Sequence, residues 1–116
     1  DANILMDFSL SRLSGLINNL VVYPENMQAN LNKLCGLVNS QRVLLALIKE
    51  GQSREKAYEI VQRCAMIVWE TKEEFFDILA NDEEVSLLLS RKQLEGCFDE
   101  NFHLKNVDII FDRVFV

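Results

Sequence analysis

The scarcity of residues that break helices constrains this chain more than any other feature. Its 116 residues include one proline and four glycines. The many short strands of a sandwich or barrel are joined by turns, and turns are rich in these two residues. Apolar residues make up 49% of the chain and charged residues 26%, as in folded globular domains. The sequence therefore predicts an all-α fold, and its length suits one domain rather than two.

The distribution of charge excludes one large class of partner. The formal net charge is −6, and the two halves of the chain differ strongly. Residues 1–58 carry six Lys/Arg against five Asp/Glu, whereas residues 59–116 carry six against thirteen. Because nucleic acids are bound chiefly through cationic side chains, we expect no nucleic-acid partner.

Membrane insertion and disulfide or zinc chemistry have no support in the sequence. No apolar run is longer than the six residues of Val43 to Ile48, where a membrane span needs about 20. No signal-peptide pattern opens the chain. The cysteines, Cys35, Cys64 and Cys97, are odd in number and widely spaced, without a C-x-x-C pair. We therefore expect no membrane partner and a location in the reducing cytoplasm.

The first 22 residues form an unusually apolar segment. Apolar residues cover most of the circumference of a helix over 2–22, and its polar stripe is narrow. Such a helix is expected to pack on more than one side and to end near Val22. A second helix is predicted from Pro24 to Leu34, because proline suits the first helical position. Because the sequence starts at Asp1 rather than Met, we expect a piece excised from a longer protein, with a processed product as the alternative.

Local signals predict a series of further helices. Gly36 and Gly51 are expected to stop helices in the left-handed conformation, and Ser53 to cap one. Thr71 to Glu74 and Ser90 to Gln93 both match the capping-box pattern. The predicted helices cover residues 37–50, 54–70, 75–79, 83–89, 91–98 and about 104–114, with Asn81-Asp82 as a break and Asp99 and Asn101 as candidate caps of the last segment.

Three consecutive polar residues on the predicted 37–50 helix are of interest. Ser40 and Gln41 fall inside its apolar arc, so both are expected to face packed surface. A buried unpaired polar group costs about 1–3 kcal/mol. We therefore expect a hydrogen bond to a neighbouring helix or to a domain outside this chain, with a ligand contact as the alternative. Arg42 falls on the polar side and is interpreted as a surface cation or ion-pair partner.

The residues of catalysis are largely missing. The single histidine, His103, cannot form a metal-binding pair and is expected at the surface or at a helix cap. No phosphate loop, dinucleotide fingerprint or nucleophile elbow occurs. The acidic cluster suits a helix start better than a metal site, and it consists of Glu70, Glu73, Glu74 and Asp77. We predict no catalytic residue, no cofactor-binding residue, no metal ligand and no cofactor in this chain.

Four segments, in order, resemble one known family. Residues 19–27 read Asn-Leu-Val-Val-Tyr-Pro-Glu-Asn-Met, and residues 36–47 read Gly-Leu-Val-Asn-Ser-Gln-Arg-Val-Leu-Leu-Ala-Leu. Residues 57–70 contain Ala-Tyr, then Ile-Val-Gln-Arg-Cys-Ala-Met and Trp-Glu. Residues 98–115 run from Phe-Asp through Leu-Lys and Val-Asp to Ile-Phe-Asp-Arg-Val-Phe. Together these segments resemble the C-terminal part of adenylosuccinate lyase, of the fumarase/aspartase superfamily.

This resemblance implies both an architecture and a function. Residues 1–22 would be the end of a long helix of a central bundle, and residues 23–116 the compact multi-helix C-terminal domain of a cytoplasmic homotetramer. The family eliminates fumarate from adenylosuccinate, giving AMP, and from SAICAR, giving AICAR, in purine biosynthesis.

The resemblance carries no catalytic residue onto this chain. The family's serine base on a mobile loop and its histidine acid would lie upstream, so this segment alone is predicted to be inactive. One departure is Asn106, where the family commonly has histidine. The alternative function is a stand-alone all-α protein-interaction module with an apolar groove.

Overall fold

The computed structural model describes residues 1–115, and the secondary structure of these residues is entirely helical. The elements, in chain order, are α1 (Ala2–Asn18), α2 (Pro24–Asn32), the 3-10 helix η1 (Leu37–Asn39), α3 (Ser40–Lys49), α4 (Arg54–Thr71), α5 (Phe75–Asn81), α6 (Glu83–Leu88), α7 (Arg91–Cys97), the 3-10 helix η2 (Glu100–His103) and α8 (Val107–Val114). The all-α prediction is confirmed.

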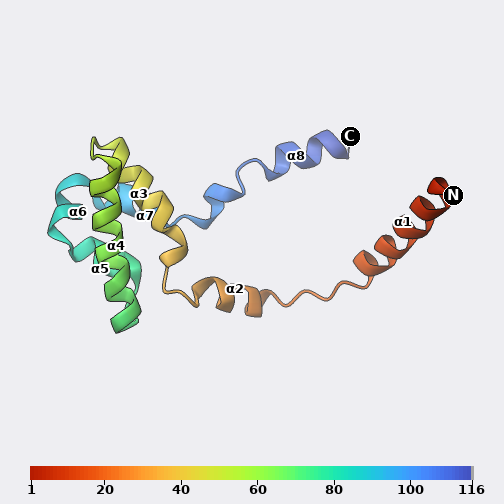
Figure 1. Ribbon diagram of the computed structural model, residues 1–116, viewed down its shortest axis with the longest axis horizontal. Coiled ribbons are helices and arrows are strands. Elements are labelled where there is room, and N and C mark those ends of the chain that lie inside the picture. Colours follow the sequence, from red (N-terminus) through yellow and green to blue (C-terminus); the bar gives the residue numbers. More distant parts are fainter. Residues whose placement is uncertain (116) are drawn as a thin grey trace.

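The molecule consists of a helical core with two arms (Figure 1). The core comprises residues 35–98, the N-terminal arm residues 1–34 and the C-terminal arm residues 99–115. Within the described chain, every buried apolar side chain lies between Val43 and Cys97. The radius of gyration is 20.5 Å, whereas a compact domain of this length has about 13 Å. Both arms therefore extend away from the core, and Figure 1 shows them leaving on the same side.

The core is built around α4, its longest helix. α4 packs against α3 and α5, and α7 packs against the same two helices. The largest completely buried side chains lie between these helices and include Phe75, Leu47 and Ile60. Because full burial of such a side chain contributes about 1.5–3 kcal/mol, these helices have the apolar contacts of an ordinary small domain.

Several predicted local signals are confirmed. The Ser53 hydroxyl accepts a hydrogen bond from the Lys56 amide at 3.2 Å. Ser90 and Gln93 form a complete capping box, in which the Ser90 hydroxyl accepts from the Gln93 amide and the Gln93 side chain accepts from the Ser90 amide. Asp82 separates α5 from α6 and caps α6, because its carboxylate accepts a hydrogen bond from the Val85 amide at 3.1 Å. These three helices, α4, α6 and α7, therefore begin where hydrogen bonds from residues nearby in the sequence satisfy their first amides.

The other predicted capping box, from Thr71 to Glu74, is wrong. Thr71 is the last residue of α4, where its hydroxyl donates to the Ile67 carbonyl at 2.9 Å and accepts from the Glu73 amide at 3.2 Å. Lys72 then takes a left-handed conformation with φ of 64°. The N-cap of α5 is Glu74, whose side chain makes no capping bond. Thr71 thus closes one helix instead of opening the next.

The arm helices also differ from prediction at their ends. α1 stops at Asn18 rather than near Val22, because the Asn19 side-chain amide donates to the Gly15 carbonyl at 2.8 Å and ends the helix. Pro24 begins α2 as predicted and disfavours helical geometry at Tyr23, whose φ and ψ are −114° and 84°.

The turn between α2 and α3 contains two left-handed residues. α2 ends at Asn32, two residues earlier than predicted, and Cys35 and Gly36 have φ of 48° and 82°. The segment expected to continue as one helix from Leu37 begins instead with η1, and Gly51 ends α3 with φ of 95° as predicted.

The C-terminal arm is less helical than predicted. Asp99 caps η2 by accepting from the Asn101 amide at 3.0 Å, so Asp99 is a cap and Asn101 is not. The helix expected from about residue 104 begins only at Val107. No helix in residues 1–115 is long and apolar enough to cross a membrane.

Candidate functional site

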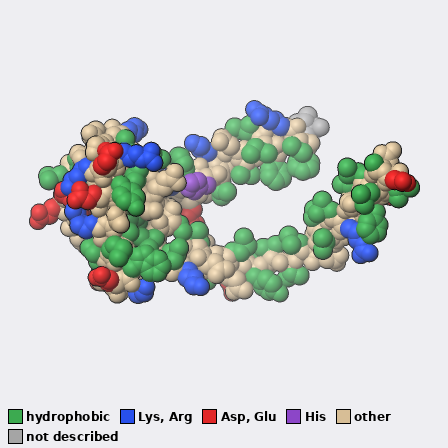
Figure 2. Space-filling model, viewed as in Figure 1, with side chains coloured by type: hydrophobic (Ala, Val, Ile, Leu, Met, Phe, Trp, Pro, Cys, Tyr) green, Lys and Arg blue, Asp and Glu red, His purple; other side chains and the backbone are tan. Residues whose placement is uncertain are grey.

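The most extensive unusual surface of the molecule is apolar and lies on the two arms. α1 buries none of its side chains, and Ile4 and Leu16 are 73% and 71% exposed. α8 also buries none, and Phe115 just beyond it is 76% exposed. Figure 2 shows hydrophobic side chains along both arms, with those of α8 facing the gap between the arms. Continuous exposed apolar surface of this kind is typical of protein–protein contacts.

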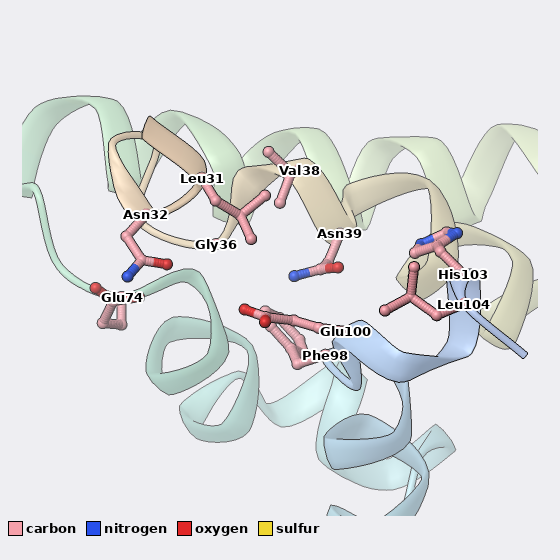
Figure 3. A pocket seen from close by; sticks show the side chains of 10 residues that line it. All are labelled: Leu31, Asn32, Gly36, Val38, Asn39, Glu74, Phe98, Glu100, His103 and Leu104. Carbon is pink, nitrogen blue, oxygen red and sulfur yellow. The ribbon is translucent and has the colours of Figure 1, made fainter. Parts of the chain in front are cut away.

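A hollow of about 490 Å³ lies where the two arms meet the core (Figure 3). Its lining residues are Leu31, Asn32, Gly36, Val38, Asn39, Glu74, Phe98, Glu100, His103 and Leu104. In Figure 3 the side chains of Asn39 and Glu100 point into this space from η1 and η2. Nearby, the Gln28 side chain of α2 donates to Glu100 at 3.4 Å and joins the two arms. The hollow is therefore a junction of three parts of the chain.

The chemistry of this hollow is that of binding rather than catalysis. Its polar groups are two carboxylates, two amides and the His103 imidazole. His103 is exposed, as expected, and its ring lies edge-on to Phe102 with centroids 5.4 Å apart. In residues 1–115 no hydrogen bond joins this imidazole to a carboxylate or a nucleophile, so an acid–base pair is not assembled there.

The acidic cluster does not converge. Glu70, Glu73, Glu74 and Asp77 are all exposed around the α4–α5 turn. Across the part of the chain that the structure describes, no three His, Cys, Asp or Glu residues are placed to hold a metal ion.

Ser40 and Gln41 lie at an edge that this chain leaves uncovered, and of the two partners expected for them a neighbouring helix is not seen among the described residues, which leaves a domain outside this chain. Ser40 is half-buried and Gln41 is exposed. Both line an open groove of about 460 Å³ on α3 and α4, together with Leu44, Leu45, Ile48, Arg54, Tyr58 and Val61. Only Val43 and Leu47 of α3 are buried, so much of its apolar arc, and Gln41 with it, is not covered by this chain.

Arg42 makes the polar tie that was expected of its neighbours. Its guanidinium donates to the carbonyls of Gly96 and of Asp99, the latter at 2.7 Å, and lies 4.1 Å from the centroid of the Phe102 ring. Arg42 is half-buried and bonds to backbone carbonyls, so it remains a partly exposed cation, as interpreted, but is not an ion-pair partner among the described residues. Its partners follow it by 54 residues or more, so periodicity along the helix gave no sign of them.

An ion-pair network joins α4 to the start of α6. Arg63 contacts Asp82 and Glu84 at 2.7 Å each, and Lys56 contacts Glu84 at 3.1 Å. Hydrogen bonds from Arg63 and Lys56 lower the pKa of Glu84. Partial burial works to raise the pKa of Asp82, but the bonds from Arg63 and from the Val85 amide outweigh it, so this pKa is also lowered. The network therefore has a structural role, since it ties α4 to the start of α6.

The two buried cysteines, Cys64 and Cys97, are not reactive nucleophiles. Burial, reinforced by the charge of Asp82, raises the pKa of the Cys64 thiol to about 11. Burial also raises the pKa of Cys97. Both side chains are therefore protonated near neutral pH, and only the thiolate form attacks an electrophile.

Comparison with known proteins identifies the family. A family model described as "Adenylosuccinate lyase C-terminus" matches residues 36–114. The chain is 46% identical over 114 residues to the adenylosuccinate lyase of Bacillus subtilis, covering 98% of this chain and 26% of that protein. The chain belongs to the adenylosuccinate lyase family. It is also 49% identical over 125 aligned positions to the adenylosuccinate lyase of Helicobacter pylori, covering 99% of this chain and 28% of that protein.

The chain matches the C-terminal part of these adenylosuccinate lyases and spans about a quarter of their length. The core from Gly36 onward, η2 and all of α8 fall within the family match, whereas α1 and α2 precede it. Both enzymes match over nearly the whole chain, which favours the lyase over the stand-alone interaction module.

Proposed function

We propose that the full-length protein eliminates fumarate from adenylosuccinate, giving AMP, and from SAICAR, giving AICAR, as a step of purine biosynthesis. In this reaction a base removes a proton from the succinyl carbon next to the one that carries nitrogen. The C–N bond then breaks, its electron pair goes to nitrogen, and an acid supplies a proton to that nitrogen. Family membership over nearly the whole chain supports this proposal.

Within that enzyme, the role proposed for this segment is structural. The residues that act as base and acid belong to other parts of the full-length chain, and none is assigned here. The hollow at the base of the arms and the α3–α4 groove carry no assembled acid–base pair among the described residues.

The arms supply the assembly contacts in this proposal. Residues 1–22 are the end of a helix of a central bundle, and residues 23–116 are the C-terminal domain. The exposed apolar surfaces of α1 and α8 then pack on other helices of a homotetramer in the cytoplasm. Partners of this kind would remove from water the apolar side chains that this chain leaves uncovered.

Fumarate release tests the activity. We expect the purified full-length protein to convert both substrates and the 116-residue chain to convert neither at high concentration. Both proteins should be prepared from a host that lacks its own lyase, so that contamination cannot supply the turnover. Turnover by the 116-residue chain would contradict the structural role, and a full-length protein inactive on both substrates would contradict the proposed activity.

A matched pair of adjacent substitutions tests the role of α1. Ile17 is apolar and 62% exposed in this chain, while Asn18 lies beside it on the polar stripe. We expect Ile17→Asp to dissociate the full-length oligomer in sedimentation experiments and Asn18→Asp to leave it intact. Equal behaviour of the two variants would contradict the packing of the apolar face of α1 in the assembly.

A further inference from the structure

The C-terminal arm leaves the core at the end of α7, and a single side chain of α3 holds this exit. Among the described residues, the side-chain hydrogen bonds and ring contacts that join α3 to residues 99–115 all come from Arg42. Its guanidinium also donates to the Gly96 carbonyl in the last turn of α7. Arg42 therefore contacts both sides of the junction between the core and the arm.

The chemistry at this junction suits arginine in particular. The last carbonyls of a helix have no partner within the helix, and the helix dipole favours a cation there. Two guanidinium nitrogens of Arg42 bond two different carbonyls while the group also lies over the Phe102 ring. A lysine ammonium has neither the planar fork nor the face that stacks on an aromatic ring.

The segment that Arg42 holds is itself braced. The Asp99 carboxylate accepts from the Asn101 amide at 3.0 Å, and Lys105 lies 4.3 Å from the centroid of the Phe102 ring. The thiol of Cys97 donates to the backbone carbonyl of Arg42 at 3.8 Å. Fixing Phe102 against α3 therefore orients the whole η2 turn, and with it the start of α8.

We propose that Arg42 is a positioning residue that sets the direction of the C-terminal arm and thereby presents the apolar face of α8 for assembly. The assembly step rests on the proposed function, while the orientation of the arm does not. The core keeps its own buried contacts without Arg42, because the fully buried side chains lie on other positions of α3 to α7.

The test uses the full-length protein with Arg42→Lys, which retains the positive charge but loses the planar guanidinium that bonds both carbonyls. Hydrogen exchange should become at least about tenfold faster in residues 100–114 and change less than about twofold in α4. The protein concentration at half-dissociation of the oligomer should rise in parallel. Arg91→Gln is the control, since it removes an exposed cation near the Phe76 ring and leaves the two carbonyls and the Phe102 ring in contact with Arg42.

A second variant keeps the test decisive if Arg42→Lys folds poorly. Phe102→Leu removes the ring and not the carbonyl contacts, so it should loosen the arm by a smaller factor. The double variant should then exchange no faster than Arg42→Lys alone, because both changes break one junction. Unchanged exchange in the arm, equal acceleration in α4, or simple additivity would overturn the proposal. None of these readouts requires lyase activity, so an inactive enzyme with a loosened arm would contradict only the proposed function.

Discussion

The core and the arms are both rich in apolar residues, yet they bury them very differently. α4 buries five side chains along one face and leaves its charged residues in solvent. α1, which is nearly as long, buries none. The two helices differ in pattern, because α4 has distinct apolar and polar faces while apolar residues surround most of α1. A wide apolar arc therefore does not mean that the rest of the same chain covers the helix.

The largest expected contrast between the two regions is in stability. Phe75 is fully buried and packs against Phe98 with ring centroids 6.1 Å apart. Phe75→Ala should lower the free energy of unfolding of this chain by about 3–5 kcal/mol, through lost burial and a cavity. Leu16→Ala in the exposed α1 should change it by less than about 0.5 kcal/mol. Denaturant titrations of both variants measure these values, and equal losses would break the distinction between core and arm.

The turn that joins the N-terminal arm to the core should be the next most sensitive. Gly36 has φ of 82°, and a Cβ added there would lie 3.2 Å from the Phe98 ring. Gly36→Ala should therefore cost about 1–3 kcal/mol, from backbone strain and the close contact. Gly15→Ala in α1 is the control, because nothing lies near its added Cβ. A neutral Gly36→Ala would show that this turn does not constrain the core.

Hydrogen bonds at the ends of helices offer a finer comparison within the core. Ser90 begins α7 with a complete capping box, whereas Thr71 lies at the end of α4. Ser90→Ala should cost about 0.5–2 kcal/mol, since it removes the acceptor of a first-turn amide. Thr71→Ala should cost less, because its hydroxyl bonds the Ile67 carbonyl and the Glu73 amide at an exposed helix end, where water can replace both bonds. Thermal unfolding of the two variants checks which loss of stability is larger. A larger loss for Thr71→Ala would contradict the distinction between a capping hydroxyl and a hydroxyl at a helix end.

The smallest expected effect is a pH dependence of stability that arises from Asp82 in the core. The pKa of Asp82 is lowered in the folded chain, so its ionised form stabilises the fold above the usual carboxyl range of about 4. That stability is lost as the pH falls through the lowered pKa. Asp82→Asn keeps a capping side chain and removes the charge, at a cost of about 1 kcal/mol or less.

Urea titrations between pH 7 and pH 3 follow this effect. The wild-type and Asp82→Asn stabilities should converge as the pH falls, because protonation removes the charge that the substitution also removes. A constant difference between the two proteins would show that the Arg63–Asp82 contact adds nothing through charge.

The sequence was sufficient wherever structure depends on neighbours along the chain. The caps at Ser53 and Ser90 and the left-handed turns at Gly36 and Gly51 were predicted because each involves residues only a few positions apart. The Thr71 pattern failed because a hydroxyl followed three residues later by glutamate also suits a helix end. The helix start was therefore ambiguous from sequence alone.

Long-range contacts account for the remaining errors. Arg42 and Gln41 are adjacent on α3, and only packing decides which of them meets the rest of the chain. The carbonyls of Gly96 and Asp99 became available to Arg42 because α7 ends beside α3. No local pattern encodes that meeting, so the sequence did not predict the tie made by Arg42.

Hydrogen exchange on this chain and on the full-length protein tests most directly whether the arms are completed by contacts outside the chain. We expect amides of α4 to be similarly protected in both proteins. Amides of α1 and α8 should be weakly protected in the 116-residue chain, diluted until it is monomeric, and strongly protected in the full-length oligomer. Arm protection equal to that of α4 in the monomeric chain would contradict the division into a self-sufficient core and two arms that need partners.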